Sequence, residues 1–274
     1  MHGVTTAPIR RFYAVAAGLA AIAGFLLFPL AGETDRFFSW TIEPPLTAAF
    51  LGAAYWAALV LLAWAATRER WADARTAMPA VAVIAALLLI TTLIHLDKFD
   101  LDSLFGWFWL VVYCLVTPLL AWAIAGQVRS AGRVERGQDP LPAGVRALLA
   151  AAGLCLAGFG VVLYADPTGA ASAWPWPLTP LTGRAIASFL IGFAVAAGFA
   201  LWENDVARLR GPAYAFSALA VLELLALAVF NGDLTASAAG VAAYVAFWAV
   251  SLALGLAGVW LSGARTERIA SGSR

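Results

Sequence analysis

Charged residues are scarce in this sequence. Asp, Glu, Lys and Arg make up 12% of its 274 residues, whereas 63% of the residues are hydrophobic. A soluble domain carries about 25% charged residues, so this chain has too few to cover a surface that faces water. The sequence therefore predicts a protein whose solvent is lipid. The formal net charge of +1 also gives no basic excess of the kind that binds nucleic acid.

Histidine and cysteine are nearly absent as well. The histidines are His2 and His95, and the cysteines Cys114 and Cys155 stand in separate apolar runs. Paired haem ligation within the chain and histidine-box chemistry are thereby excluded. The sequence has no HExxH, GxxxxGK[ST] or CxxC motif, so zinc proteolysis, P-loop nucleotide hydrolysis and thiol–disulfide exchange lack support. Because no nucleophile–base pair can be assembled in the apolar runs, the sequence indicates neither an enzyme nor a cofactor.

Long apolar runs are what the sequence has in abundance. Each is close to the ~20 residues that a helix needs to cross the bilayer, and a helix satisfies its own backbone hydrogen bonds in lipid. The sequence thus predicts an all-α integral membrane protein with eight transmembrane helices. The predicted spans are 12–31, 46–66, 78–96, 105–126, 146–165, 183–202, 212–230 and 239–261.

The basic residues predict the orientation of these spans. Of the 17 Lys and Arg residues, 14 lie at the two termini or in alternate loops, and the other three are Arg36, Lys98 and Arg184. Since basic flanks remain cytoplasmic, both termini are predicted to be cytoplasmic. The Ala- and Arg-rich usage, with a single Lys, is typical of a bacterial protein, so the predicted location is the bacterial inner membrane.

An internal duplication is also indicated. Several matches recur at one offset of 135 positions without a gap: the PLT motif at 45–47 and 180–182, Arg11 with Arg146, and Arg75 with Arg210. Four helices per unit make both units enter the membrane from the same side, so the sequence predicts two parallel four-helix repeats. The predicted parts are a first repeat (1–126), a cytoplasmic linker (127–145), a second repeat (146–262) and a cytoplasmic tail (263–274).

Glu223 is the sharpest candidate for function, since it stands in the apolar run AVLELLALAVF. A carboxyl group near the bilayer centre costs about 2.5–3.5 kcal/mol on insertion scales, so it should face the bundle interior and serve as a proton, cation or substrate site. The alternative is a structural Glu bonded to a neighbouring helix. Arg184 and His95, near the outer mouth, complete the predicted intramembrane polar site. Arg184 is a potential partner of Glu223, although it could instead extend to the headgroups.

The stretch WPWPLTPLTGR is predicted to form a stiff loop at the outer interface. Proline restricts the backbone of this loop, and Trp favours the headgroup level of the bilayer. Trp174 and Trp176 are therefore predicted to be interfacial anchors, with Pro180 in the loop and Thr182 as the N-cap of the next helix. A ligand-binding loop is the alternative.

His95, Asp97, Asp100 and Asp102 form a weak candidate metal site on the same side. Imidazole and carboxylate groups suit Mn or Zn, but the spacing matches no defined metal-binding loop. A solvated acidic loop is the alternative interpretation.

Two functional hypotheses follow. The first is a small-molecule or ion transporter or binding protein with a polar site between the two repeats. The second is a non-catalytic subunit or assembly factor of a membrane complex. The predicted partners are the lipid bilayer and, in addition, other membrane subunits or a second copy of the chain.

Overall fold

The computed structural model describes residues 3–130, 137 and 139–272 and is almost entirely helical in these residues. The long helices are α1 (Ala7–Leu27), α3 (Pro45–Ala66), α5 (Met78–Ile94), α6 (Leu104–Ser130), α7 (Ala143–Ala165), α9 (Pro180–Glu203), α10 (Arg210–Val229) and α11 (Ala238–Gly272). The short helices are α2 (Thr34–Phe37), α4 (Trp71–Ala74) and α8 (Pro167–Ala170), and the 3-10 turns are η1 (Ala31–Glu33), η2 (Arg75–Ala77), η3 (Leu96–Lys98), η4 (Ala171–Ala173), η5 (Ala207–Leu209) and η6 (Asn231–Asp233).

The prediction of eight apolar spans is confirmed. In the part of the chain that the structure describes, eight helices are long and apolar enough to cross a membrane, as the ~30 Å hydrocarbon layer requires. Their bounds follow the predicted runs closely, except that α11 continues to Gly272, beyond the predicted end at 261. The protein is therefore a multi-pass membrane protein whose solvent is the lipid bilayer.

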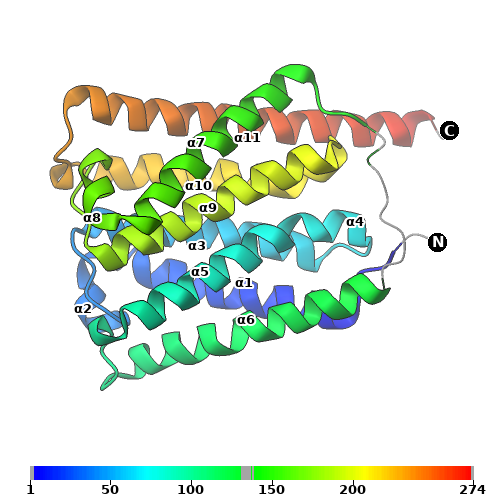
Figure 1. Ribbon diagram of the computed structural model, residues 1–274. Coiled ribbons are helices and arrows are strands. Elements are labelled where there is room, and N and C mark those ends of the chain that lie inside the picture. The colour runs from blue at the N-terminus through cyan, green and yellow to red at the C-terminus, as the bar shows by residue number, and fades with distance from the viewer. Residues whose placement is uncertain (1–2, 131–136, 138, 273–274) are drawn as a thin grey trace.

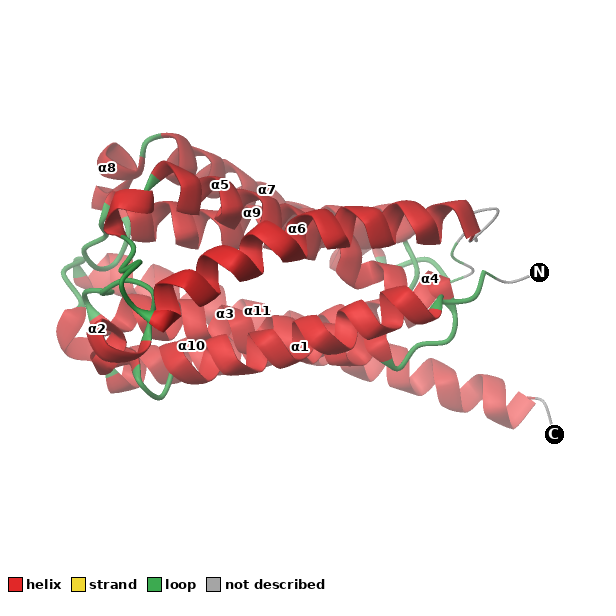
Figure 2. Ribbon diagram, turned by 90° about the horizontal axis from the view of Figure 1, so that it is seen from below, coloured by secondary structure: helices red, strands yellow, loops and turns green. Residues whose placement is uncertain are grey.

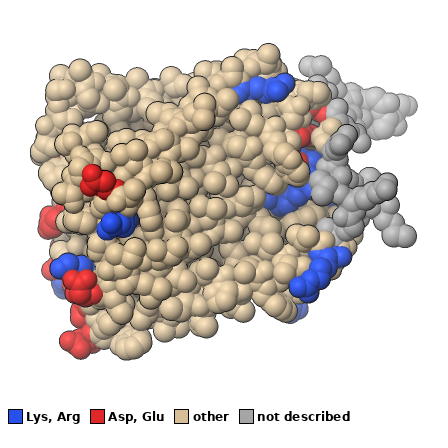
Figure 3. All heavy atoms as spheres, viewed as in Figure 1, with Lys and Arg blue, Asp and Glu red and all other residues tan. Residues whose placement is uncertain are grey.

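The long helices run between two ends of the bundle, where the connecting loops gather (Figure 2). α1 begins and α11 ends at the same end, which we call the terminal end; the opposite end is the distal end (Figure 1). On the face drawn in Figure 3, Lys, Arg, Asp and Glu side chains lie towards the two ends, and a broad band between them carries no charge. Such a band is what a hydrocarbon layer requires.

Helices α3 and α9 form the centre of the bundle. α3 packs against α1 and α10, and α9 packs against α7 and α5. Small side chains allow helices to approach closely in a membrane, and α3 buries Ala49, Ala53 and Ala57 at four-residue spacing. On α9, a Cβ atom at Gly192 would overlap the side chain of Ile84 on α5.

Candidate functional site

Glu223 lies on the inward face of α10 and is completely buried. Its Oε2 atom accepts a hydrogen bond of 2.9 Å from the hydroxyl group of Tyr244 on α11. Its Oε1 atom has no hydrogen-bond partner among the described residues. The predicted pair between Glu223 and Arg184 is wrong, because Tyr244 takes the position of the partner and Arg184 bonds elsewhere.

Aromatic rings surround Tyr244, which lies near the start of α11 at the distal end of the bundle. Tyr244 makes edge-on contacts with Trp176 at 5.5 Å, Trp174 at 6.0 Å and Trp248 at 6.1 Å between ring centroids. Edge-to-face packing of this kind stabilises aromatic pairs beyond their buried area. We call this group the Tyr244 cluster; it consists of Phe50, Phe159, Trp174, Trp176, Tyr244, Phe247 and Trp248.

The two tryptophans of the WPWP loop belong to this cluster and not to the lipid interface. Trp174 and Trp176 are 8% and 0% exposed, and the indole nitrogen of Trp176 donates a hydrogen bond of 2.8 Å to Thr47 Oγ1 on α3. The carbonyl group of Pro175 accepts from the backbone N–H groups of Thr235 and Ala236, so the loop is tied to the segment that precedes α11. The interpretation of these indoles as headgroup anchors is therefore wrong.

The predicted N-cap is displaced by three residues. α9 begins at Pro180, and its N-cap is Thr179, whose side chain accepts a hydrogen bond from the backbone N–H of Thr182. The Thr182 hydroxyl in turn accepts from the backbone N–H of Thr179 at 3.0 Å. Thr182 thus completes a capping box, which stabilises the start of α9 directly after the aromatic loop.

A cavity of about 130 Å³ adjoins the Tyr244 cluster. Its walls come from α7, α9, α11 and the WPWP loop, and the described residues present no polar atom to it. The lining residues are Cys155, Leu156, Phe159, Trp174, Leu190, Tyr244, Phe247 and Trp248. Glu223 does not line the cavity; Tyr244 does, and its hydroxyl group connects the cavity wall to the carboxyl group.

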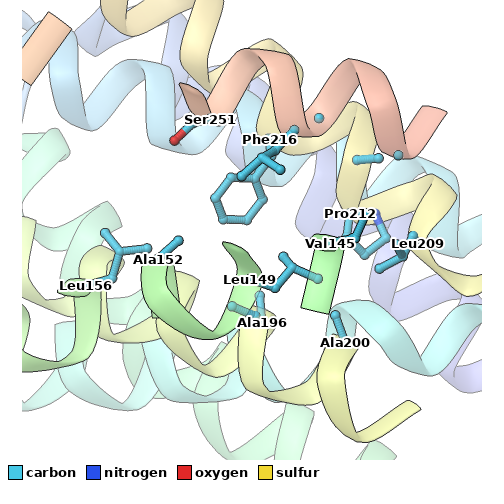
Figure 4. A pocket seen from close by; sticks show the side chains of 15 residues that line it. Val145, Leu149, Ala152, Leu156, Ala196, Ala200, Leu209, Pro212, Phe216 and Ser251 are labelled. Atoms are coloured by element: carbon cyan, nitrogen blue, oxygen red, sulfur yellow. The ribbon is translucent and has the colours of Figure 1, made fainter. Parts of the chain in front are cut away.

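A second cavity, of about 80 Å³, lies between α7, α9, α10 and α11 towards the terminal end (Figure 4). Its walls are almost wholly apolar, with Leu149, Phe216 and Ser251 among the lining side chains. Leu156 lines both this cavity and the aromatic one. A third cavity, of about 110 Å³, lies between α1, α3, α5 and α6 and is lined by Tyr55, Trp109 and Tyr113.

The side chains of His95 and Arg184 contact each other at the distal end of the bundle. The Arg184 guanidinium donates to His95 Nε2 at 2.8 Å and to the Tyr164 carbonyl at 3.2 Å. Because Arg is always protonated, His95 Nε2 must accept and is therefore neutral in this arrangement. Partial burial, followed by the nearby Arg184 charge, lowers the pKa of His95 below its ordinary 6.5.

This contact predicts a loss of stability in acid. The unfolded chain protonates His95 near its ordinary pKa of 6.5, whereas the folded protein holds it neutral to lower pH. The unfolded state therefore binds more protons in this window, so the free energy of unfolding falls as pH decreases from about 6.5. Unfolding in mixed micelles at several pH values should show this slope in the wild type and a smaller slope in His95→Gln. An equal slope in both proteins would contradict the assignment.

The acidic residues near His95 do not gather around it. No three His, Cys, Asp or Glu side chains in the described ranges could hold a metal ion. Asp97 pairs with Lys98 at 3.1 Å, which lowers the pKa of its carboxyl, and Asp100 accepts from the backbone N–H of Asp102. The metal interpretation of His95, Asp97, Asp100 and Asp102 therefore gains no support.

A buried ion cluster at the terminal end was not predicted from the sequence. Arg75 donates two hydrogen bonds to the Glu203 carboxylate, at 2.6 and 2.8 Å, and Arg208 also pairs with Glu203. Asp205 lies 3.8 Å from the Arg208 guanidinium. All four side chains are at most 8% exposed. We call Arg75, Glu203, Asp205 and Arg208 the terminal ion cluster.

Comparison with protein-family models, curated proteins and solved structures finds no match to this chain. The case for a function therefore comes from the contacts of Glu223 and the rings and cavities beside it.

Proposed function

We propose that this chain binds a small molecule within the membrane and carries it across, with Glu223 as the polar anchor of the site. The observation that carries the proposal is a completely buried carboxyl group with one unpartnered oxygen, joined through Tyr244 to an aromatic cavity. Ionisable groups inside a membrane are costly and usually mark substrate or ion pathways. A concave, mostly apolar pocket with a few convergent polar groups is the usual form of a ligand site.

Helix packing supports the proposed duplication into two parallel four-helix repeats. In the first half α1 packs on α3, and in the second half α7 packs on α9. Each half also places its third long helix against the second long helix of the other half: α5 packs on α9, and α10 packs on α3. A pseudo-twofold arrangement produces such reciprocal pairs.

The cavities correspond in the same way. Five residues of the aromatic cavity have counterparts 135 positions earlier that line the cavity of the first half. These pairs are Cys155 with Ala20, Leu190 with Tyr55, Tyr244 with Trp109, Phe247 with Val112, and Trp248 with Tyr113. At the same offset Glu223 corresponds to Leu88. The carboxyl group of Glu223 therefore has no counterpart in the first repeat. This difference supports a role for Glu223 in binding, since a role in the shared fold would call for an acid in both repeats.

The charge distribution supports a cytoplasmic terminal end. The ends of the helices that 14 of the 17 basic residues flank in the sequence lie at this end, and basic segments remain on the cytoplasmic side. In this orientation the aromatic cavity faces the outer half of a bacterial inner membrane. The terminal ion cluster then closes the bundle on the cytoplasmic side, where Arg75 of the first repeat binds Glu203 of the second.

A ligand screen on the full chain tests this function. The purified protein is melted in the presence of a panel of amines, amino acids, sugars, carboxylates and inorganic ions, and compounds that stabilise it are assayed for uptake into proteoliposomes. At about 100 times its Kd a ligand adds about 2.7 kcal/mol to the stability of the folded state. We expect stabilisation and uptake by one class of compound in the wild type, and a loss of both in Glu223→Gln.

The matched control is Glu33→Gln, which removes an exposed carboxyl group at the distal end and should leave ligand binding unchanged. Equal uptake by the wild type and Glu223→Gln would overturn the role of Glu223. The absence of any Glu223-dependent ligand, together with a membrane partner that co-purifies in stoichiometric amount, would favour the hypothesis of a non-catalytic subunit.

A further inference from the structure

The aromatic cavity has walls suited to a cation that needs no hydrogen bond. Five of its lining residues present aromatic rings: Phe159, Trp174, Tyr244, Phe247 and Trp248. The face of an aromatic ring attracts a cation within about 6 Å of its centroid, and Trp attracts it most strongly. Several rings meet here at steep angles, for example 78° between Trp174 and Tyr244 and 73° between Tyr244 and Trp248. The rings around the cavity therefore lie in several orientations, although Phe159 and Trp174 stack nearly parallel at 15°.

The absence of polar atoms on the cavity wall restricts the ligand further. The N–H donors of a primary ammonium group would find no polar acceptor on the surface of this wall, and a buried donor without an acceptor is unfavourable. An anion would find no basic side chain on this wall. A quaternary ammonium group carries a positive charge but has no N–H bond, and its methyl groups pack against rings as apolar groups do.

Glu223 supplies the charge that complements such a ligand. Its carboxyl group accepts a hydrogen bond of 2.9 Å from the hydroxyl group of Tyr244, which lines the cavity. A phenol that donates to a carboxylate is polarised by it, so the Tyr244 ring becomes richer in electrons and attracts a cation more strongly. A cation held in the cavity would favour the ionised form of this buried carboxyl group, because a nearby opposite charge offsets its loss of hydration.

We propose that the cavity walled by Trp174, Tyr244 and Trp248 binds a quaternary ammonium group, with Glu223 as the counter-charge. The volume agrees with this ligand: about 130 Å³ is close to an engineered cavity of about 150 Å³ that binds benzene in another protein, and a trimethylammonium head is similar in size. This inference rests on the proposed binding function and specifies its ligand.

Calorimetric titration of the full chain in nanodiscs without choline lipids tests the ligand class. The probes are tetramethylammonium and choline, and the uncharged control is 3,3-dimethyl-1-butanol, which has the shape of choline. We expect both cations to bind at least about tenfold more tightly than the neutral compound, as a desolvated cation–π site implies. Equal affinity of choline and its neutral analogue would overturn the proposal.

Substitutions at the site distinguish a loss of ligand binding from a loss of folding. Glu223→Gln and Tyr244→Phe each keep the size of the side chain, and each is expected to weaken tetramethylammonium binding, the former by about tenfold or more. The matched controls are Tyr113→Phe and Trp109→Phe in the related cavity of the first half, which has no acid, and these should bind as the wild type does. Thermal unfolding without ligand identifies any variant that fails to fold. An equal loss in the control variants, or no loss in Glu223→Gln and Tyr244→Phe, would overturn the proposal.

The quaternary ammonium group can belong to a free solute or to a choline lipid. Repeating the titration in phosphatidylcholine nanodiscs distinguishes these sources: a lipid ligand competes and raises the apparent Kd of tetramethylammonium, whereas a solute site keeps the same Kd. Either result supports the proposal, provided that the cation binds. If another class of compound binds in a Glu223-dependent manner and both cations do not, the ligand class is wrong while the binding function stands.

Discussion

The substitution Glu203→Gln is expected to lower the free energy of unfolding by about 3–5 kcal/mol, because it removes the buried carboxylate that Arg75 and Arg208 share. The Glu203 side chain is 2% exposed and pairs with both Arg75 and Arg208, whose side chains are 8% and 6% exposed. Each guanidinium loses its hydration on burial, and its ion pair with the Glu203 carboxylate offsets the free-energy cost of that loss. Glutamine keeps the shape of the side chain but removes the charge.

The measurement is the unfolding of purified wild type and Glu203→Gln in mixed micelles. The matched control is Glu33→Gln, which breaks the Arg36–Glu33 pair, whose side chains are 66% and 49% exposed. An exposed pair contributes about 0–1 kcal/mol, so this variant should unfold almost as the wild type does. Equal stabilities of the two variants would show that the terminal ion cluster is hydrated and does not depend on its buried charges.

The eight apolar spans could be predicted from the sequence because lipid restricts the conformation of the chain so strongly. Backbone polar groups need internal partners in hydrocarbon, so runs of about 20 apolar residues predict helices whatever they pack against. The same argument placed Glu223 inside the bundle, and it is completely buried. It could not name Tyr244 as the partner, since packing between helices depends on the rotation of α10 and α11, which apolar residues on every face leave undetermined.

The terminal ion cluster illustrates a second limit of the sequence. Arg75 and Glu203 are 128 positions apart, and the count of basic residues treated Arg75 only as a positive charge on a cytoplasmic flank. A signal was nevertheless present, because Glu203 and Asp205 are acidic residues between two spans on the flank that is otherwise rich in arginine. An acidic residue there suggests a partner, but only the packing of η2 against α9 shows which arginine it is.

The WPWP loop was misinterpreted for a related reason. Trp is enriched at membrane interfaces, and nothing in the local sequence distinguishes an indole that faces headgroups from one that packs inward. Thr47 belongs to the PLT motif that recurs in α9, but its role as acceptor for Trp176 depends on contact between segments 129 positions apart. Because Trp176 is completely buried, its substitution should destabilise the fold strongly, whereas substitution of an interfacial anchor should have a small effect.

The substitution Trp176→Ala is expected to destabilise the fold by about 3–5 kcal/mol, since it removes a large, completely buried side chain. Trp176→Phe keeps most of the packing but removes the donor to Thr47, which should cost about 1–3 kcal/mol because a buried hydroxyl loses its partner. Thr47→Val likewise leaves the buried indole N–H of Trp176 without its acceptor. A double-mutant cycle of Trp176→Phe with Thr47→Val, followed by unfolding in mixed micelles, measures the energy of this contact.

The matched control for this cycle is Trp122→Phe, because Trp122 on α6 is 68% exposed on the surface of the bundle. Substitutions at exposed positions usually change stability by less than about 0.5 kcal/mol. If Trp176 were an interfacial anchor, Trp122→Phe and Trp176→Phe would have similar small effects, and the coupling to Thr47→Val would be close to zero. A coupling energy above about 0.5 kcal/mol, confined to Trp176, is the result that the buried indole requires.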